Sequence, residues 1–361
     1  MILQALKEYY DRKASDPESD IAPEGFEKKE LQFLIVINEQ GEFINIEDTR
    51  EKIGNRLVAK TFLLPRSKGR TGNKAYETTF LLWDHIGYVL GLPTSDVKSS
   101  KQHQTWLKSL KELPQDLVED VGVKAIINFY ENGEISKVIS SPMIEECLKA
   151  TQCNMSFRLV SDCPVPCRPK VQEFVRNNFT NNSIEKDDID LGKTDQIGVC
   201  LVTGEIGTIA RTLGATPINK DAKILVGFQK NSGYDSYGKQ QGYNAPIIKS
   251  TEFAYVTALN TLLKSENQRL QIGDASTVFW SKKPSSFESD FAFFFKEPDK
   301  DDPDAGTQRV KALFESVNSG SYVEDDGDDL FYILGLSPNA ARIAVRFWQV
   351  GTIAEFASRI R

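Results

Sequence analysis

Apolar residues recur along this chain with two different periods. A spacing of three to four residues, typical of amphipathic helices, predicts helices over residues 2–13, 78–90, 98–112, 116–131, 170–178 and 251–263. Runs rich in β-branched and aromatic residues predict strands over residues 31–38, 42–46, 56–64, 155–160, 198–202, 223–228, 277–280 and 331–336. Because these elements follow no strict βα repeat, the pattern favours an α+β fold, with mixed sheets and flanking helices.

The end of the chain carries a helix-start signal. Ser337 suits an N-cap and Pro338 suits the first helical position, so we expect a helix over residues 339–348 and another from residue 352. The expected organisation is an α+β domain over residues 1–335, with a sub-boundary near residue 150. The start of a C-terminal helical region then covers residues 336–361, which we expect to belong to a longer protein.

Composition and targeting signals indicate an ordinary globular chain. No apolar run is long enough to span a bilayer, so no membrane partner is expected. The first residues, MILQALKEYYDRK, read as an amphipathic helix and not as a signal peptide, which predicts a cytoplasmic protein.

Charge is distributed unevenly. The chain carries a net charge of −7, but residues 284–330 hold thirteen acidic and four basic residues. The remainder is therefore close to neutral and contains local basic patches. One is the stretch KTFLLPRSKGRTGNK at residues 60–74, with five basic residues and no acidic one. Such a balance permits a basic groove for nucleic acid on an otherwise acidic body.

Side chains suited to catalysis are sparse. The chain has only two histidines, His85 and His103, and no phosphate-binding loop, so we expect no catalytic residues and no cofactor. Cys163, Cys167 and Cys200 leave a zinc site open, although a tetrahedral site needs four ligands. The acidic pairs at 301–304 and 324–329 leave a metal nuclease open as well, but a solvated charge run explains them better.

Two glycine-rich loops are the best candidates for a binding site. In each, glycines allow close approach of the backbone, lysine and arginine suit phosphates, and amide side chains suit base edges. In the first loop the candidates are Lys60, Arg66, Lys68, Arg70, Thr71, Gly72, Asn73 and Lys74. In the second they are Lys230, Asn231, Ser232, Tyr237, Gly238, Lys239, Gln240, Gln241 and Asn244. Tyrosines of the second loop could stack on bases or pack the loop down.

An ordered set of motifs resembles one known family. The motifs are MILQALKEYYDR, IAPEGFEKKELQFLIVIN, LLWDHIGYVLG, CLVTGE, SYGKQQGYNAP, QIGDASTVFW and SPNAARIAVRFW. Together they resemble the large subunit of the type I-C CRISPR surveillance complex, Cascade. The resemblance runs from the first residues to the last. Family members usually continue with a further long helical region, which is absent here.

The resemblance implies a non-catalytic subunit of an RNA-guided DNA-targeting complex. Such a subunit lies near the 5′ handle of the guide RNA and contacts the backbone and handle-capping subunits. It inspects duplex DNA for the protospacer-adjacent motif, helps to open the duplex and docks a helicase-nuclease. Guide pairing reads the target sequence and the protein reads only the adjacent motif. The alternative is a scaffold subunit that binds the guide handle and neighbouring subunits without reading DNA.

Overall fold

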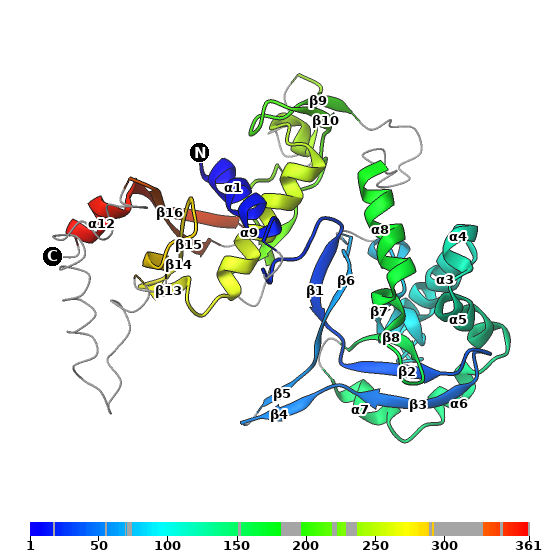
Figure 1. Cartoon of the computed structure of the whole chain (residues 1–361). Helices are drawn as coiled ribbons and strands as arrows, with labels where there is room; N and C mark the ends of the chain where they lie inside the picture. The colour runs from blue at the N-terminus through cyan, green and yellow to red at the C-terminus, as the bar shows by residue number, and fades with distance from the viewer. Residues whose placement is uncertain are drawn as a thin grey trace. The chain divides into compact units, whose positions relative to one another are not determined.

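The described part of the chain forms two compact units. The computed structural model describes residues 1–16, 19–54, 56–68, 70, 74–150, 153–181, 196–218, 222–228, 237–288, 291, 328–339 and 342–359. Unit 1 contains Met1–Ile21 and Ser183–Arg361, and unit 2 contains Ala22–Asn182. Both units combine helices with sheets (Figure 1), which confirms the α+β class. The domain boundaries expected from the sequence stay a prediction.

The sheet of unit 2 is built around β2 (Phe33–Ile37). This strand pairs antiparallel with β3 (Phe43–Asp48), as the hairpin prediction required, and parallel with β8 (Asn154–Leu159). A short fourth strand, β7 (Trp83–His85), pairs antiparallel with β8. All residues of β2 are buried. A strand covered on both faces needs a continuous apolar run, which is what the sequence LQFLIVIN provides.

Helices surround this sheet and complete the core of unit 2. They are α2 (Ile86–Val89), α3 (Val97–Lys111), α4 (Gln115–Val118), α5 (Val121–Glu131), α6 (Ile135–Ile139), α7 (Ile144–Lys149) and α8 (Pro169–Asn181). The rings of Phe129 on α5 and Phe157 on β8 lie 5.1 Å apart, edge to face. Trp106 of α3 is buried in the same hydrophobic cluster. The apolar side chains of the longer helices thus join one hydrophobic cluster with those of the sheet.

Two antiparallel ribbons extend unit 2. β1 (Phe26–Glu30) pairs with β6 (Thr61–Pro65), and β4 (Glu51–Ile53) pairs with β5 (Arg56–Val58). Figure 1 shows β4 and β5 reaching away from the rest of the unit as a two-stranded finger. Every residue of these two strands is exposed.

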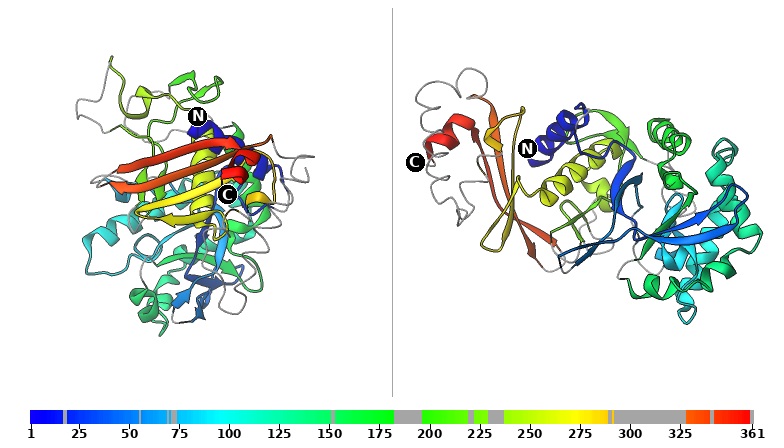
Figure 2. Two further views of the ribbon diagram at one scale, coloured as in Figure 1. Left: turned by 90° about the vertical axis from the view of Figure 1, so that its left-hand side faces the viewer. Right: turned by 60° about the horizontal axis from the view of Figure 1, so that its bottom comes forward.

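Unit 1 is a four-stranded antiparallel sheet covered by helices. The strand order is β13 (Arg269–Ile272), β14 (Ala275–Ser281), β15 (Leu330–Asn339) and β16 (Arg342–Thr352). Helices α1 (Ile2–Ala14) and α9 (Lys249–Lys264) lie together on one face of the sheet (Figure 2). The Tyr9 and Trp280 rings, 6.3 Å apart, join α1 to β14. On the opposite face, Phe279, Phe331 and Ile353 of α12 (Ile353–Arg359) belong to a second cluster.

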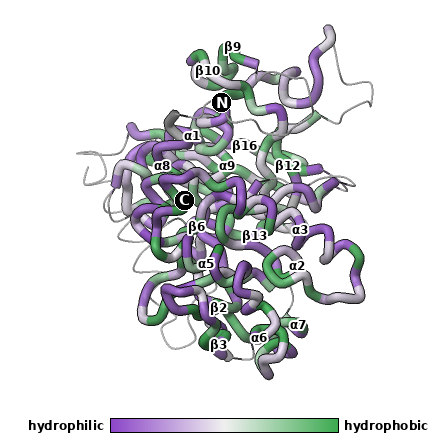
Figure 3. Tube along the Cα trace, turned by 90° about the vertical axis from the view of Figure 1, so that its right-hand side faces the viewer, coloured by the Kyte–Doolittle hydropathy of each residue, from purple (hydrophilic) through white to green (hydrophobic). Residues whose placement is uncertain are grey.

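A short hairpin in unit 1 exposes aliphatic side chains. β9 (Ile197–Val199) pairs with β10 (Ile206–Thr208), and both read as hydrophobic in Figure 3. Gly198 and Gly207 face inward, because a Cβ on either would lie within 3.4 Å of Ile209 or Ile248. The alternation of a strand therefore turns the aliphatic residues outward. The exposed ones are Ile197, Val199, Leu201 and Ile206.

Other elements of unit 1 are short, and two strand predictions were only partly right. β11 (Ala215–Pro217) pairs with β12 (Ala222–Ile224), so β12 ends before residue 228. The strand predicted over 198–202 ends at Val199, where a turn begins.

The helix predicted over residues 78–90 is wrong. The segment contains β7 and only a short α2. Leu82 has a φ of 63°, in the left-handed region that a right-handed helix cannot contain. The buried Asp84 carboxylate accepts hydrogen bonds from the Phe80 and His85 backbone N–H groups.

The single strand predicted over residues 56–64 is in fact two strands, β5 and β6, which belong to different ribbons.

The helix predicted over residues 339–348 is also wrong. β15 continues to Asn339, and β16 returns antiparallel to it, with Leu334 opposite Trp348. Ser337 does not cap a helix, since its hydroxyl donates to Asp274 Oδ2 at 2.9 Å. The β-branched and aromatic residues of RIAVRFWQV suit a strand, and pairing with β15 outweighed the Ser-Pro signal. The helix predicted from residue 352 is confirmed as α12.

Candidate nucleic-acid interface

The basic loop of unit 2 starts where β6 ends. The Arg66 N–H donates to the Gly25 carbonyl at 2.9 Å, and the Ser67 N–H donates to Glu27 Oε1 at 2.8 Å. Both acceptors belong to the β1 side of the ribbon, so the loop leaves a fixed edge. At its far end the short helix η1 (Ala75–Glu77) is tied down when the Tyr88 hydroxyl donates to the Ala75 carbonyl at 3.0 Å.

Arg70 is clamped inside unit 2. Its guanidinium carbon lies 3.7 Å from the centre of the Phe80 ring and 4.0 Å from that of Tyr88. Its Nε donates to the Thr78 carbonyl at 2.9 Å, and a terminal nitrogen pairs with Asp84. Asp84 is completely buried, and burial raises the pKa of its carboxyl while Arg70 acts against that shift. The charge of Arg70 is thus used to fix the middle of the loop, which makes Arg70 a positioning residue.

The lysines of this loop point outward. Lys68 is exposed. The side chain of Lys74 is 80% exposed, with Glu77 a distant 3.9 Å away. Lys60 is exposed beside Glu51 at 3.6 Å, and Arg66 is half-buried with a partner inside the chain. Gly69, Thr71, Gly72 and Asn73 lie outside the described residues.

In the described part of the second loop, one aromatic side chain is fully exposed to solvent. Tyr237 is 100% exposed, and its φ of 51° lies in the left-handed region. Gly238 follows with a φ of 74°, and Lys239 is exposed. An aromatic residue gains nothing from full exposure, and left-handed backbone is costly for it, so the pair of features marks a functional candidate. Lys230, Asn231 and Ser232 lie outside the described residues.

The base of the second loop is held by backbone contacts. The helix η3 (Gln241–Asn244) places Gly242 against the chain after β10, where the Gly242 N–H donates to the Arg211 carbonyl at 2.8 Å. A Cβ on Gly242 would lie 2.3 Å from the Ala210 carbonyl oxygen, so only glycine fits. Asn244 Nδ2 donates to the Gln241 carbonyl at 3.1 Å. Asn244, Gln240 and Gln241 all have partners within the chain.

The structure brings candidates together within each loop but assigns the two loops to different units. The first belongs to unit 2 and the second to unit 1. It also adds Lys52 and Arg56, which are exposed on the β4–β5 finger just before Lys60. Sequence reasoning missed them because strands of three residues carry too little periodicity to be recognised. Asp84, the partner of Arg70, gave no signal either.

The cysteines lie in different surroundings. Cys163 is exposed, Cys167 donates weakly to the Leu63 carbonyl at 3.5 Å, and Cys200 is buried in the other unit. Among the described residues, no group of three or more His, Cys, Asp or Glu side chains could hold a metal ion. Residues 301–304 and 324–327 lie outside that part of the chain. No described helix has the length and apolar character needed to cross a bilayer.

Comparison with known proteins places the chain in a family. Residues 6–361 match the family described as CRISPR-associated protein (Cas_Csd1). The match covers nearly the whole chain, so the chain belongs to this family, and the resemblance seen in its motifs is confirmed. Membership makes it a CRISPR-associated protein, a component of a Cascade complex with other Cas subunits. A search of curated proteins found no match.

Proposed function

We propose that this chain is the non-catalytic large subunit of a type I-C Cascade and reads the protospacer-adjacent motif in duplex DNA. It acts in the cytoplasm, aids opening of the duplex and docks the helicase-nuclease. The observation that carries the proposal is the Arg70 clamp. It fixes the middle of a loop whose Lys68 and Lys74 are exposed on either side of Arg70. A loop held in this way can meet a duplex in one orientation, which reading a motif requires.

Different residues of this loop have different roles. Lys68 and Lys74 contact phosphates and supply affinity that depends on salt. Asn73 is the candidate reader of base edges, because an amide can donate and accept at once. The second loop binds nucleic acid through Tyr237 and Lys239, with guide RNA or target DNA as its ligand.

A scaffold role remains the second candidate. The exposed aliphatic face of β9 and β10 favours it, since such patches usually mark contacts between protein subunits. In that case the chain binds the guide handle and neighbouring subunits, and DNA affinity does not depend on the basic loop.

The salt dependence of binding separates these candidates. In the assembled complex, the double change Lys68→Ala and Lys74→Ala should weaken binding to a motif-containing duplex. It should also reduce the slope of log affinity against log salt by about two units. The control is Lys108→Ala with Lys124→Ala, two exposed lysines of α3 and α5. An unchanged slope in the loop variant would refute the DNA-reading role and leave the scaffold. The duplex should stay intact in the same samples with Mg²⁺ present.

A further inference from the structure

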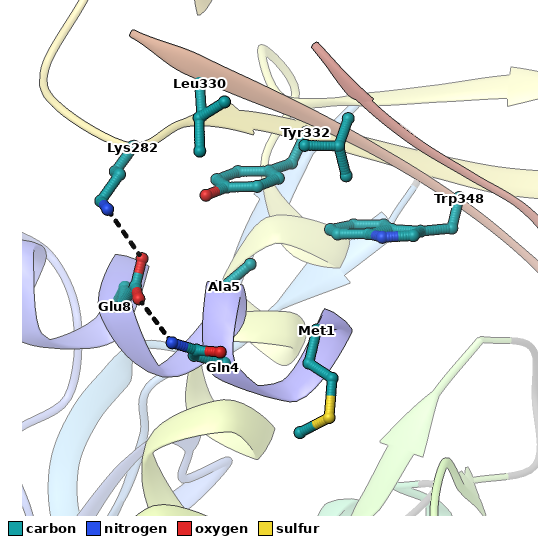
Figure 4. A pocket seen from close by; sticks show the side chains of 9 residues that line it. Met1, Gln4, Ala5, Glu8, Lys282, Leu330, Tyr332 and Trp348 are labelled. Atoms are coloured by element: carbon teal, nitrogen blue, oxygen red, sulfur yellow. Dashed lines mark hydrogen bonds and ion pairs between the residues drawn. The ribbon is translucent and has the colours of Figure 1, made fainter. Parts of the chain in front are cut away.

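A pocket of about 240 Å³ lies in unit 1 between α1 and the sheet face that α1 covers (Figure 4). Ala5 and Gln4 line it from the helix, and Tyr332 and Trp348 line it from the sheet. Pockets for drug-sized ligands usually enclose about 300–1,000 Å³. This pocket is smaller, so it suits one planar ring system.

Two aromatic rings form one wall of the pocket. The planes of Tyr332 and Trp348 differ by only 7°, and the ring centres lie 5.5 Å apart. Figure 4 shows Ala5 of α1 pointing toward these rings. A short side chain opposite a flat aromatic wall leaves a slot for another flat group. Burial and the nearby Glu8 carboxylate raise the pKa of the Tyr332 phenol, which keeps that wall uncharged.

The rim of the pocket carries polar groups of three kinds. Glu8 Oε2 lies 3.8 Å from Lys282 Nζ, and Gln4 Nε2 donates to Glu8 Oε1 at 3.2 Å. The side chain of Lys282 is 48% exposed, so its ammonium can also reach an anion outside the pocket. Gln4 is exposed and offers an amide, which can both donate to and accept from a ring edge.

We infer that this pocket takes one unstacked base of single-stranded nucleic acid. The base stacks on Trp348, the Gln4 amide meets its edge, and Lys282 contacts the adjoining phosphate. This site is built from residues of unit 1 alone and goes beyond the proposed function.

Two other ligands fit the same groups less well. An arginine or lysine of a partner protein would need Glu8, whose carboxylate already faces the positive charge of Lys282. A bare phosphate would leave the aromatic wall unused. A base with its phosphate uses the rings, the amide and the ammonium together.

Trp348 provides a direct test. Trp83, Trp106 and Trp280 are fully buried, and Trp348 alone among the four tryptophans is partly exposed. Stacking of a base should therefore quench the fluorescence of Trp348 selectively. The probe is a single-stranded hexamer of adenosine nucleotides, titrated into the full chain. An abasic hexamer with the same phosphates is the matched control, and it should bind more weakly and cause no quenching.

Variants separate stacking from charge. Trp348→Ala should lower affinity for a labelled adenosine hexamer about tenfold, the size of one stacking contact, and Trp348→Phe should keep most of it. Lys282→Gln should reduce the salt slope by about one unit, and Lys264→Gln on α9 should not. Circular dichroism confirms that each variant is folded.

Equal binding of both hexamers without quenching would overturn the inference. An affinity for the adenosine hexamer that Trp348→Ala leaves unchanged would also overturn it. That result is expected if the pocket binds a side chain of a partner protein instead of a base. Because these assays use single strands and unit 1 variants, their failure is distinct from failure of the duplex assay on Lys68 and Lys74.

Discussion

The two glycine-rich loops look alike in sequence but are held in opposite ways. In unit 2, the charged side chain of Arg70 turns inward between two rings and meets a buried carboxylate. In unit 1, the main chain at Gly242 lies directly against the carbonyl oxygens of Ala210 and Arg211. One loop depends on a charge pair and the other on the absence of a side chain.

The difference shows which residues are left for a ligand. Where an arginine fixes the loop, the exposed groups are the lysines, Lys68 and Lys74. Where backbone and the Asn244 amide fix the loop, Tyr237 and Lys239 are the exposed candidate side chains among its described residues. Residue type alone therefore does not separate ligand contacts from supports, because each loop uses one of its apparent ligand groups to hold itself.

The largest effect should come from breaking the charge pair. Arg70→Ala leaves the Asp84 carboxylate buried without its cation, which should lower the free energy of unfolding of unit 2 by about 3–5 kcal/mol. Urea denaturation of the full chain, monitored by circular dichroism, measures this loss as a lower urea concentration at the midpoint of the unfolding transition of unit 2. Adding Asp84→Asn should recover part of the loss, because no unpaired charge then remains. An Arg70→Ala variant as stable as Lys74→Ala would disprove the clamp.

A smaller loss should follow from filling the gap at Gly242. Gly242→Ala puts a methyl group 2.3 Å from the Ala210 carbonyl oxygen, so the loop base must shift, at a cost of about 1–3 kcal/mol. Gly238→Ala is the matched control. It has open space around its Cβ position, and only its φ of 74° opposes the change. The comparison between the loops fails if Gly242→Ala costs no more than Gly238→Ala in thermal unfolding.

The smallest expected effect is a gain in stability, and it should come from replacing Tyr237. Tyr237→Gly removes a fully exposed ring and relieves a left-handed backbone, which should raise the free energy of unfolding by up to about 1 kcal/mol. Binding of nucleic acid by the assembled complex should fall at the same time, because a stacking surface is lost. Tyr237→Phe should bind normally. A Tyr237→Gly complex that still binds normally would show that the tyrosine has no ligand.

Sequence periodicity predicted the elements that carry long, regular patterns. Helices α1, α3, α8 and α9 and the β2–β3 hairpin were found because each shows several turns or alternations of its period. Residues 339–348 were misread because Ser337-Pro338 is a local signal, whereas β16 is fixed by pairing along β15. Tertiary pairing is invisible to a local pattern.

The sequence marked the two candidate loops, but it did not indicate how each loop is held in place. Glycines and basic residues marked both loops, yet nothing in the sequence indicated that Arg70 would meet Asp84 or that Gly242 would touch Ala210. The pocket beside Trp348 was also missed. Its lining residues come from the first eight residues, from Lys282 and from strands β15 and β16, and only the fold brings such distant stretches together.

Unit 1 is closed by the first helix of the chain, and this has a consequence for how the protein is made. Tyr9 of α1 packs on Trp280, and Arg12 of α1 forms an ion pair with Glu288. Both partners are synthesised more than 260 residues after α1. Unit 2 is continuous and can fold while the ribosome completes the chain, whereas α1 must wait with its aromatic face uncovered. In a nascent chain, α1 therefore reaches its packing partners only after residue 288 has been synthesised, so unit 1 closes after unit 2 can fold.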